Sequence, residues 1–380
     1  MQQMLACNDF YNALTKHNIT FFTGVPDSLL KDICAYITDH TSPDRHIIAA
    51  NEGNAVALAV GSYLSMGYPG LVYMQNSGLG NAVNPLTSLA DPDVYSVPLL
   101  MMIGWRGEPG GVKDEPQHVK QGKITLQLLE TLGIPYSILP DEPVLALLVV
   151  QEAARVMEQL LCPYALVVRA DTFQSYKLQK QVVTAYEMVR EDAIKIFAEW
   201  NLNTDVIVST TGKTSRELFE QRKQSGRMGQ DFLTVGSMGH ASQIALGIAL
   251  ARSEQQVFCL DGDGAFIMHM GALAIIGTQH VPNFKHIVIN NGAHDSVGGQ
   301  PTAGFEIDVP AVARACGYRY AARAETCEEL VAELERLRAS QGPALLEVRV
   351  NKGARPNLGR PTTSAIQNKE SFMALLQEMR

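Results

Sequence analysis

The sequence predicts an α/β protein with two doubly wound parallel-sheet domains, and three observations support this fold class. Short apolar runs of strand length alternate with longer helix-like stretches along the whole chain, as in parallel sheets covered by helices. At 380 residues the chain is too long for one ordinary hydrophobic core. A content of 46% hydrophobic residues is enough to fill two cores. Strands are predicted at residues 47–50, 70–74, 99–103, 164–168, 206–209, 257–260, 286–290 and 345–350.

The domain organisation follows from a polar stretch in the middle of the chain. We predict a first domain over residues 1–170, a linker over 171–185 and a second domain over 186–380.

The net charge of −8 argues against general affinity for nucleic acid. The six cysteines are scattered without a Cys-x-x-Cys pair. No signal peptide and no run of membrane-spanning length is visible, so we expect a cytoplasmic protein that does not enter a membrane.

In the first domain, three loops carry polar residues of interest. Thr-Gly-Val-Pro-Asp contains Asp27 and resembles the Gly-x-Pro-Asp loop after the first strand of thiamin-dependent decarboxylases, which implies a place near the reacting carbon; the alternative is a helix N-cap. Asn-Glu-Gly-Asn opens a helix that ends near residue 64, so Glu52 lies in its first turn. There it either serves chemistry or only complements the helix dipole. Gln-Asn-Ser-Gly-Leu-Gly-Asn brings the uncharged Asn81 to a third loop.

A basic loop rich in Gly and Pro follows the strand predicted at 99–103. Its cationic and imidazole side chains are Arg106, Lys113, His118, Lys120 and Lys123. Such a loop in an acidic protein could bind a dianionic group of a substrate. The alternative, strongest for the lysines, is a solvated surface loop.

The second domain carries the most informative pattern of the chain. Gly-Asp-Gly, with Asp263 at its centre, follows the strand at 257–260 and precedes a helix predicted over 265–278. Asn-Asn, ending in Asn291, follows the next strand. Ligands of open parallel sheets lie at the carboxyl ends of strands, and helix N-termini bind phosphate. Carboxylate and amide oxygens suit Mg²⁺ or Ca²⁺. Either half alone could be a simple turn, but together they predict a metal–diphosphate site.

Two further segments of this domain precede helices. Gly212-Lys213-Thr214 looks like the end of a P-loop, but the residue five positions earlier is Ile207 rather than glycine, so a P-loop is rejected. Val-Gly-Ser-Met-Gly-His precedes an apolar helix predicted over 241–250. Met238 in this segment is either a cofactor contact or ordinary core packing.

Gly-Asp-Gly followed about thirty residues later by Asn-Asn resembles the motif of thiamin-diphosphate enzymes. Asn-Glu-x-Asn resembles the element of their pyruvate-decarboxylase-like members, in which the glutamate hydrogen-bonds the aminopyrimidine ring; here this would be Glu52. The resemblance implies a pyrimidine-binding and a diphosphate-binding domain without a third, central domain. It also implies a homo-oligomer with active sites between chains. The implied ligands of Mg²⁺ are Asp263, Asn291 and the carbonyl of Ala293. The implied cofactor contacts are Thr211, Gly212, Gly236, Met238, Gly262, Asp263, Gly264 and Ala265, the last of which replaces the serine of relatives.

The loops of the first domain resemble those of decarboxylases acting on 3-phosphonopyruvate, with decarboxylases of 3-sulfopyruvate as near neighbours. This resemblance implies conversion of 3-phosphonopyruvate to phosphonoacetaldehyde and CO₂, in biosynthesis of 2-aminoethylphosphonate or a phosphonate natural product. Two alternatives stay open: another 3-substituted pyruvate as substrate, or a non-catalytic thiamin-fold subunit of a complex. The candidate substrate-binding residues are Asp27, Asn81, Arg106, Lys120 and Lys123. The candidate proton donors are Asp27, His118 and His294, because Val297 stands where pyruvate decarboxylases carry an acid.

Overall fold

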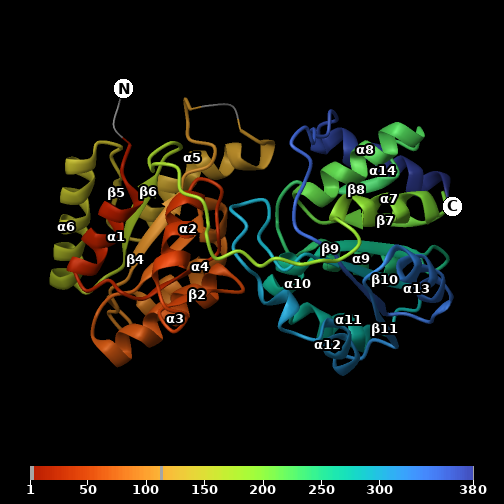
Figure 1. Ribbon diagram of the computed structural model, residues 1–380, viewed down its shortest axis with the longest axis horizontal. Coiled ribbons are helices and arrows are strands. Elements are labelled where there is room, and N and C mark those ends of the chain that lie inside the picture. The colour runs from red at the N-terminus through yellow and green to blue at the C-terminus, as the bar shows by residue number, and fades with distance from the viewer. Residues whose placement is uncertain (1–3, 112–113, 380) are drawn as a thin grey trace. The chain divides into compact units, whose positions relative to one another are not determined.

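The computed structural model describes residues 4–111 and 114–379, and the chain forms two compact α/β units. The first unit comprises Met1–Gln181 and Val297–Gln300, and the second comprises Val182–Ser296 and Pro301–Arg380. Each is built on a six-stranded parallel sheet with helices on both faces (Figure 1). The predicted α/β class with two doubly wound parallel sheets is therefore confirmed.

The first sheet has the strand order β2-β1-β3-β4-β6-β5. Its strands are β1 (Phe22–Gly24), β2 (His46–Ile48), β3 (Leu71–Gln75), β4 (Leu100–Gly104), β5 (Tyr136–Ile138) and β6 (Tyr164–Val168). Its helices are α1 (Cys7–Lys16), α2 (Lys31–His40), α3 (Glu52–Met66), α4 (Leu79–Pro85), α5 (Pro116–Thr131) and α6 (Pro143–Leu160). Alternate residues of β3 enter two separate cores. Leu71 and Tyr73 pack with α1, α2 and α6, whereas Val72 and Met74 pack with α3, α4 and α5.

The second sheet has the order β11-β12-β10-β9-β7-β8. Its strands are β7 (Val206–Ser209), β8 (Asp231–Leu233), β9 (Val257–Gly262), β10 (Phe284–Asn290), β11 (Tyr320–Ala324) and β12 (Ala344–Arg349). The helices α7 (Arg190–Trp200), α8 (Lys213–Ser225) and α13 (Cys327–Ala339) cover one face. The other face is covered by α9 (Ala241–Ala251), α10 (Asp263–Met268), α11 (Ala272–Gln279), α12 (Val309–Ala315) and α14 (Ala365–Glu378).

The two units repeat one topology. When the strands are numbered within each unit, both sheets read 2-1-3-4-6-5. The order therefore reverses between the first and third strand of each unit, and such a reversal is where open α/β sheets bind ligands. These positions are β1 and β3 in the first unit and β7 and β9 in the second. The repetition is not visible in the sequence, because different side chains fill the two pairs of cores.

The eight predicted strands correspond to β2, β3, β4, β6, β7, β9, β10 and β12, each within two residues at either end. The single helix predicted over 265–278 is wrong, because α10 ends at Met268 and α11 begins at Ala272. Gly271 lowers helix propensity at this break. In addition, Gly239 packs so closely here that a Cβ atom on it would lie 2.6 Å from Cδ2 of His269.

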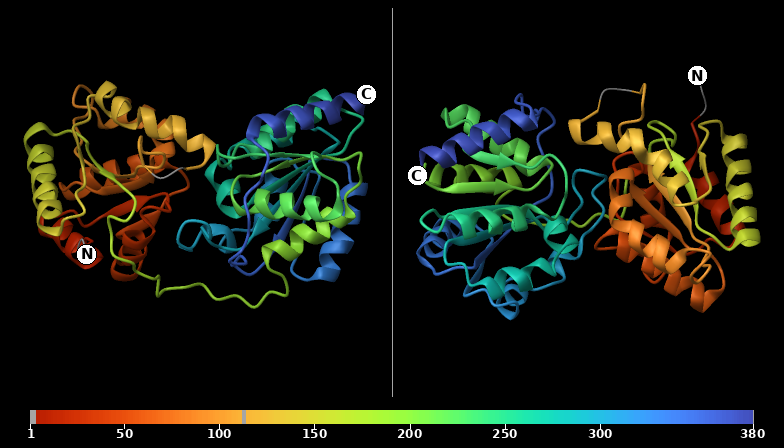
Figure 2. Two further views of the ribbon diagram at one scale, coloured as in Figure 1. Left: turned by 90° about the horizontal axis from the view of Figure 1, so that it is seen from above. Right: turned by 180° about the vertical axis from the view of Figure 1, so that it is seen from behind.

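The segment over residues 171–185 contains no helix or named strand and is yellow-green in Figure 2. Its first part is tied to α2, because Asp39 accepts the backbone N–H groups of Gln179 and Lys180 at 2.7 and 2.8 Å. Farther along, the Thr184 hydroxyl donates to Asn351 at 2.8 Å in the second unit. No helix in the described part of the chain has the length and apolar character of a membrane span.

Candidate functional site

A pocket of about 90 Å³ lies at the carboxyl ends of β7, β9 and β10, where the strand order of the second sheet reverses. It gathers residues that are distant in the sequence. Nine predicted site residues line it: Thr211, Met238, Gly262, Asp263, Gly264, Ala265, Asn291, Ala293 and His294. Gly212 lies between the lining residues Thr211 and Lys213, and Gly236 is two residues before Met238. Gly212 has a φ of 93° and is the N-cap of α8, a backbone conformation that favours glycine.

Asp263 is the buried acid of this pocket. It is the first residue of α10, 4% exposed, and its Oδ2 accepts a short hydrogen bond from the Thr302 hydroxyl. Burial raises the pKa of Asp263 to about 6, although the Thr302 hydroxyl and the backbone N–H of Asn291 act in the opposite direction. A carboxylate held away from water in this way is stabilised by a bound cation.

Asn290 ends β10 and Asn291 follows it, and the two asparagines have different roles. Asn290 is fully buried, and its Nδ2 donates to the Gly304 carbonyl and to Glu347 Oε1, both at 2.7 Å. It therefore fixes the loop structure. Asn291 lines the pocket, and its Oδ1 accepts the backbone N–H of Ala293 at 3.1 Å. Oxygens of Asp263, Asn291 and Ala293 are the hard donors that Mg²⁺ prefers, so the residues present fit that metal.

Cationic and hydroxyl groups that were not among the predicted cofactor contacts complete the pocket. Arg190 and Lys213 line it, and both are paired with Asp295, at 3.1 and 3.0 Å. Arg190 also forms a two-pronged pair with Glu217, with both bonds at 2.8 Å. The Thr210 hydroxyl is buried at the lining without a hydrogen-bond partner among the described residues. Cations and an unsatisfied hydroxyl around a small pocket fit the diphosphate of thiamin diphosphate.

Met238 and His294 flank Gly264. A Cβ atom on Gly264 would lie 3.4 Å from the His294 ring and 3.7 Å from Cε of Met238. Removal from water lowers the pKa of His294 to about 4. The ring is therefore neutral at pH 7, which does not favour it as a proton donor there.

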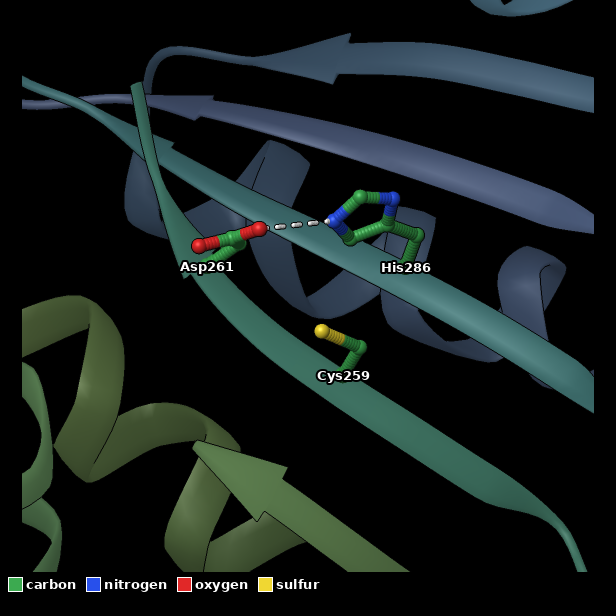
Figure 3. A group of neighbouring side chains, drawn as sticks. All are labelled: Cys259, Asp261 and His286. Atoms are coloured by element: carbon green, nitrogen blue, oxygen red, sulfur yellow. Dashed lines mark hydrogen bonds and ion pairs between the residues drawn. The ribbon is translucent and has the colours of Figure 1, made fainter. Parts of the chain in front are cut away.

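A buried polar trio lies behind the Gly-Asp-Gly turn, on one face of the second sheet (Figure 3). Cys259 and Asp261 come from β9 and His286 from β10, and each is at most 1% exposed. Nε2 of His286 lies 3.4 Å from Oδ2 of Asp261, whose Oδ1 accepts the N–H of Gly262 at 3.1 Å. A closed zinc site would use four ligands, and no fourth histidine, cysteine or carboxylate joins the group among the described residues. The trio is better suited to holding the turn that carries Asp263.

Glu52 is a buried acid of the first unit. It is the first residue of α3, directly after the N-cap Asn51, whose side chain accepts the N–H of Asn54 at 3.0 Å. Glu52 is 6% exposed, and its Oε2 accepts a hydrogen bond from Nδ2 of Asn81 at 2.9 Å. The η1 turn (Asn76–Gly78) packs on it, because a Cβ atom on Gly78 would lie 2.4 Å from Oε1. A helix-dipole role alone does not require such close enclosure.

Asp27 is fully buried at the reversal between β1 and β3. It accepts Nε2 of Gln75 at 2.7 Å and the N–H of Leu29 at 2.9 Å. It is not the N-cap of α2, because that position belongs to Leu30. Burial raises the pKa of Asp27, although these hydrogen bonds and the charge of Arg106 act in the opposite direction. Asp27 therefore keeps a proton to higher pH than an ordinary aspartic acid.

The predicted basic loop divides into a buried and an exposed part. Arg106 forms a two-pronged pair with Asp114, and Nδ1 of His118 lies 3.0 Å from Oδ1 of the same Asp114. Lys120 and Lys123 lie on the exposed side of α5, apart from this group. Lys113 lies outside the described residues. The structure thus brings Arg106 and His118 together and leaves Lys120 and Lys123 exposed to solvent.

Comparisons with known proteins agree with this geometry. The family of thiamine pyrophosphate enzymes matches through its N-terminal TPP binding domain at residues 5–126 and its C-terminal TPP binding domain at 210–348. Phosphonopyruvate decarboxylase from Streptomyces viridochromogenes is 34% identical over 389 residues, covering 98% of this chain and 95% of that protein. The enzyme of the same name from Streptomyces hygroscopicus is 35% identical over 374 residues, covering 94% and 90%.

A third relative has a different name. Sulfopyruvate decarboxylase from Methanosarcina acetivorans is 29% identical over 325 residues, covering 80% of this chain and 81% of that protein. The matches to the phosphonopyruvate decarboxylases extend over nearly the whole length of both chains. This chain therefore belongs to the thiamine pyrophosphate enzyme family, as a homologue of the phosphonopyruvate decarboxylases.

Proposed function

We propose that this protein decarboxylates 3-phosphonopyruvate to phosphonoacetaldehyde and CO₂, with thiamin diphosphate and Mg²⁺, as a step of phosphonate biosynthesis. The observation that carries the proposal is the group formed by Asp27, Ser28 and Arg106. Arg106 Nη1 donates to the Ser28 hydroxyl at 2.7 Å, which brings a cation beside a buried, proton-holding acid. A 3-substituted pyruvate with a charged end group needs this combination of anion recognition and proton delivery.

Thiamin diphosphate supplies a carbon nucleophile and an electron sink for the electrons released with CO₂. Asp263, Asn291 and the Ala293 carbonyl would bind Mg²⁺, and Lys213 and Arg190 would add positive charge beside the diphosphate. The nearby backbone and side chains would hold the cofactor: Thr211, Gly212, Gly236, Met238, Gly262, Gly264 and Ala265. Glu52 would hydrogen-bond the pyrimidine ring, with its carboxylate kept in place by Asn81.

Asp27 is the strongest of the three candidate proton donors. Its pKa is raised, so it holds a proton nearer to neutral pH. His118 is held by Asp114, and His294 is neutral at pH 7. On the substrate side, Arg106 is a partly buried candidate, and Asn81 is exposed but hydrogen-bonded to Glu52. Lys120 and Lys123 would act only through their charge at the protein surface.

Assembly and location are part of the same proposal. We infer a cytoplasmic homo-oligomer in which Glu52 of one chain and Asp263 of another serve one cofactor. Mixing an inactive Glu52→Gln variant with an inactive Asp263→Ala variant tests this arrangement. Recovery of activity on subunit exchange supports sites between chains, and no recovery argues for sites within one chain.

Sulfopyruvate is the second candidate substrate, because a sulfopyruvate decarboxylase also matches most of the chain. The test is kcat/KM of the purified chain for 3-phosphonopyruvate and 3-sulfopyruvate, with thiamin diphosphate and Mg²⁺. We expect preference for the phosphonate. Preference for the sulfonate would reassign the substrate, and no turnover by the chain alone would favour a subunit that needs a partner.

A further inference from the structure

We propose that the carboxylate of Asp114 is an internal occupant of the anion subsite, and that the charged end group of the substrate displaces it. This inference rests on the proposed function. Five donors converge on this one side chain. Oδ2 accepts Nε of Arg106 at 2.7 Å and the N–H of Gly107 at 3.1 Å. Oδ1 accepts Nη2 of Arg106, the N–H of Glu115 at 2.7 Å and Nδ1–H of His118 at 3.0 Å.

The donors around Asp114 are of the kinds that bind oxyanions. A guanidinium fork, an imidazole and backbone N–H groups around one point are the donors that recognise phosphonate, phosphate and sulfonate oxygens. The side chains of Arg106, Asp114 and His118 are 18%, 14% and 10% exposed, so the subsite is sheltered but reachable from solvent. A dianion with three oxygens can engage the same donors with more charge than Asp114 supplies.

The turn that carries the donors is held more firmly than the carboxylate. Gly107 has a φ of 70°, and a Cβ atom on it would lie 2.1 Å from the carbonyl oxygen of His118. A Cβ atom on Gly122 would lie 1.7 Å from the carbonyl oxygen of Gly107. The turn after β4 is thus packed directly on α5, which fixes Arg106, Gly107 and His118 relative to one another. The carboxylate of Asp114 is held through its hydrogen bonds, which the anionic group of the substrate would replace.

The subsite also lies at the right place for the proposed reaction. Arg106 uses Nη1 to bind the Ser28 hydroxyl at 2.7 Å, next to the buried Asp27. An anionic group bound by Arg106 and His118 would therefore have its carbon chain close to the candidate proton donor. In this arrangement His118 binds the substrate through Nδ1–H rather than transferring the proton.

The opposing interpretation is that Asp114 only orients Arg106 and His118. The two interpretations predict opposite changes in anion affinity when Asp114 is replaced. If Asp114 competes with the substrate, removing its charge strengthens anion binding; if Asp114 positions the donors, removing it weakens anion binding. An internal occupant that fills the subsite for about nine-tenths of the time lowers the apparent affinity about tenfold.

The experiment uses Asp114→Ser, which keeps a hydroxyl acceptor for the backbone N–H groups, and Asp114→Ala. Glu158→Gln, an exposed carboxylate on α6, is the matched control for the change in net charge. We expect both Asp114 variants to bind phosphonoacetate about tenfold more tightly than the wild type in calorimetry on the cofactor-free full chain. In the Asp114 variants, KM for phosphonopyruvate should fall by a similar factor while KM for pyruvate stays unchanged. In the control variant, phosphonoacetate binding and both KM values should stay at the wild-type level.

Unchanged or weaker phosphonoacetate binding in the folded Asp114 variants would overturn the inference. If neither variant folds, Arg106→Gln gives a second test. It should bind phosphonoacetate more weakly than the wild type does, and unchanged binding would also overturn the inference. The calorimetry does not depend on turnover. Failure of the proposed function would appear instead as a wild-type chain that binds phosphonoacetate but does not decarboxylate phosphonopyruvate.

Discussion

Replacing Gly78 with alanine should inactivate the protein although Gly78 offers no chemical group. Gly78 ends the η1 turn with a φ of −75°, so alanine meets no backbone strain there. Its Cβ atom would lie 2.4 Å from Oε1 of Glu52 and 2.5 Å from Cδ, whereas ordinary contacts begin near 3.4 Å. The carboxylate must therefore move by about 1 Å, and a misplacement of that size costs about 100-fold in rate, or roughly 2.7 kcal/mol of barrier.

The assay is kcat/KM for CO₂ release, measured beside thermal unfolding. Gly80→Ala is the matched control, because a Cβ atom there meets nothing within 4 Å. We expect Gly80→Ala to keep wild-type activity and Gly78→Ala to lose about two orders of magnitude while remaining folded. Crowding of the core is expected to cost Gly78→Ala about 1–3 kcal/mol of stability. A folded Gly78→Ala variant within about threefold of the control would refute the role given to Glu52.

Three further predictions concern the metal, the pH and the substrate. Asp263→Ala should weaken Mg²⁺-dependent cofactor binding at least tenfold in fluorescence titration, and an unchanged Mg²⁺ requirement would contradict its assignment as a ligand. Because the pKa of Asp263 is raised to about 6, Mg²⁺ must displace a proton from this carboxyl group below that pH. The apparent affinity for Mg²⁺ should therefore fall by up to about tenfold per pH unit from pH 6 towards 5, and should not change above pH 7. Arg106→Gln should raise KM for phosphonopyruvate by about tenfold or more but leave that for pyruvate nearly unchanged, and equal effects would remove Arg106 from anion recognition.

The central part of the fold follows from the sequence because buried parallel strands are uninterrupted apolar runs. Val206–Ser209 and Tyr164–Val168 are of this kind, and the prediction matches their observed bounds. The short edge strands have no such signal. Asp231–Leu233 spans three residues, and Tyr320–Ala324 includes Arg323, which pairs with Glu347 on the neighbouring strand. The alanine-rich sequence of this strand has low strand propensity, and its pairing with β12 holds it in place.

The residues of the candidate site were likewise predictable from the sequence only in part. Asp263 and Asn291 were predictable because both follow apolar runs that end at one edge of the sheet. Thr302, which donates to Asp263, lies 39 residues farther along the chain and carries no spacing signal. Arg190 and Lys213 come from helix N-termini whose orientation depends on the complete sheet. Asp114 carries no signal in the sequence either, because Arg106, Gly107 and His118 become its neighbours only when the loop packs on α5.

The assignment of Glu52, Asp263 and Asn291 to one thiamin-dependent decarboxylation is tested most directly by identifying the product. Purified chain with thiamin diphosphate and Mg²⁺ is mixed with 3-phosphonopyruvate, and the reaction is followed by phosphorus NMR. The account predicts that the phosphonopyruvate resonance is replaced by that of phosphonoacetaldehyde, only when both cofactor and metal are present. Persistence of the phosphonopyruvate signal under these conditions, with a folded and cofactor-bound chain, would contradict it.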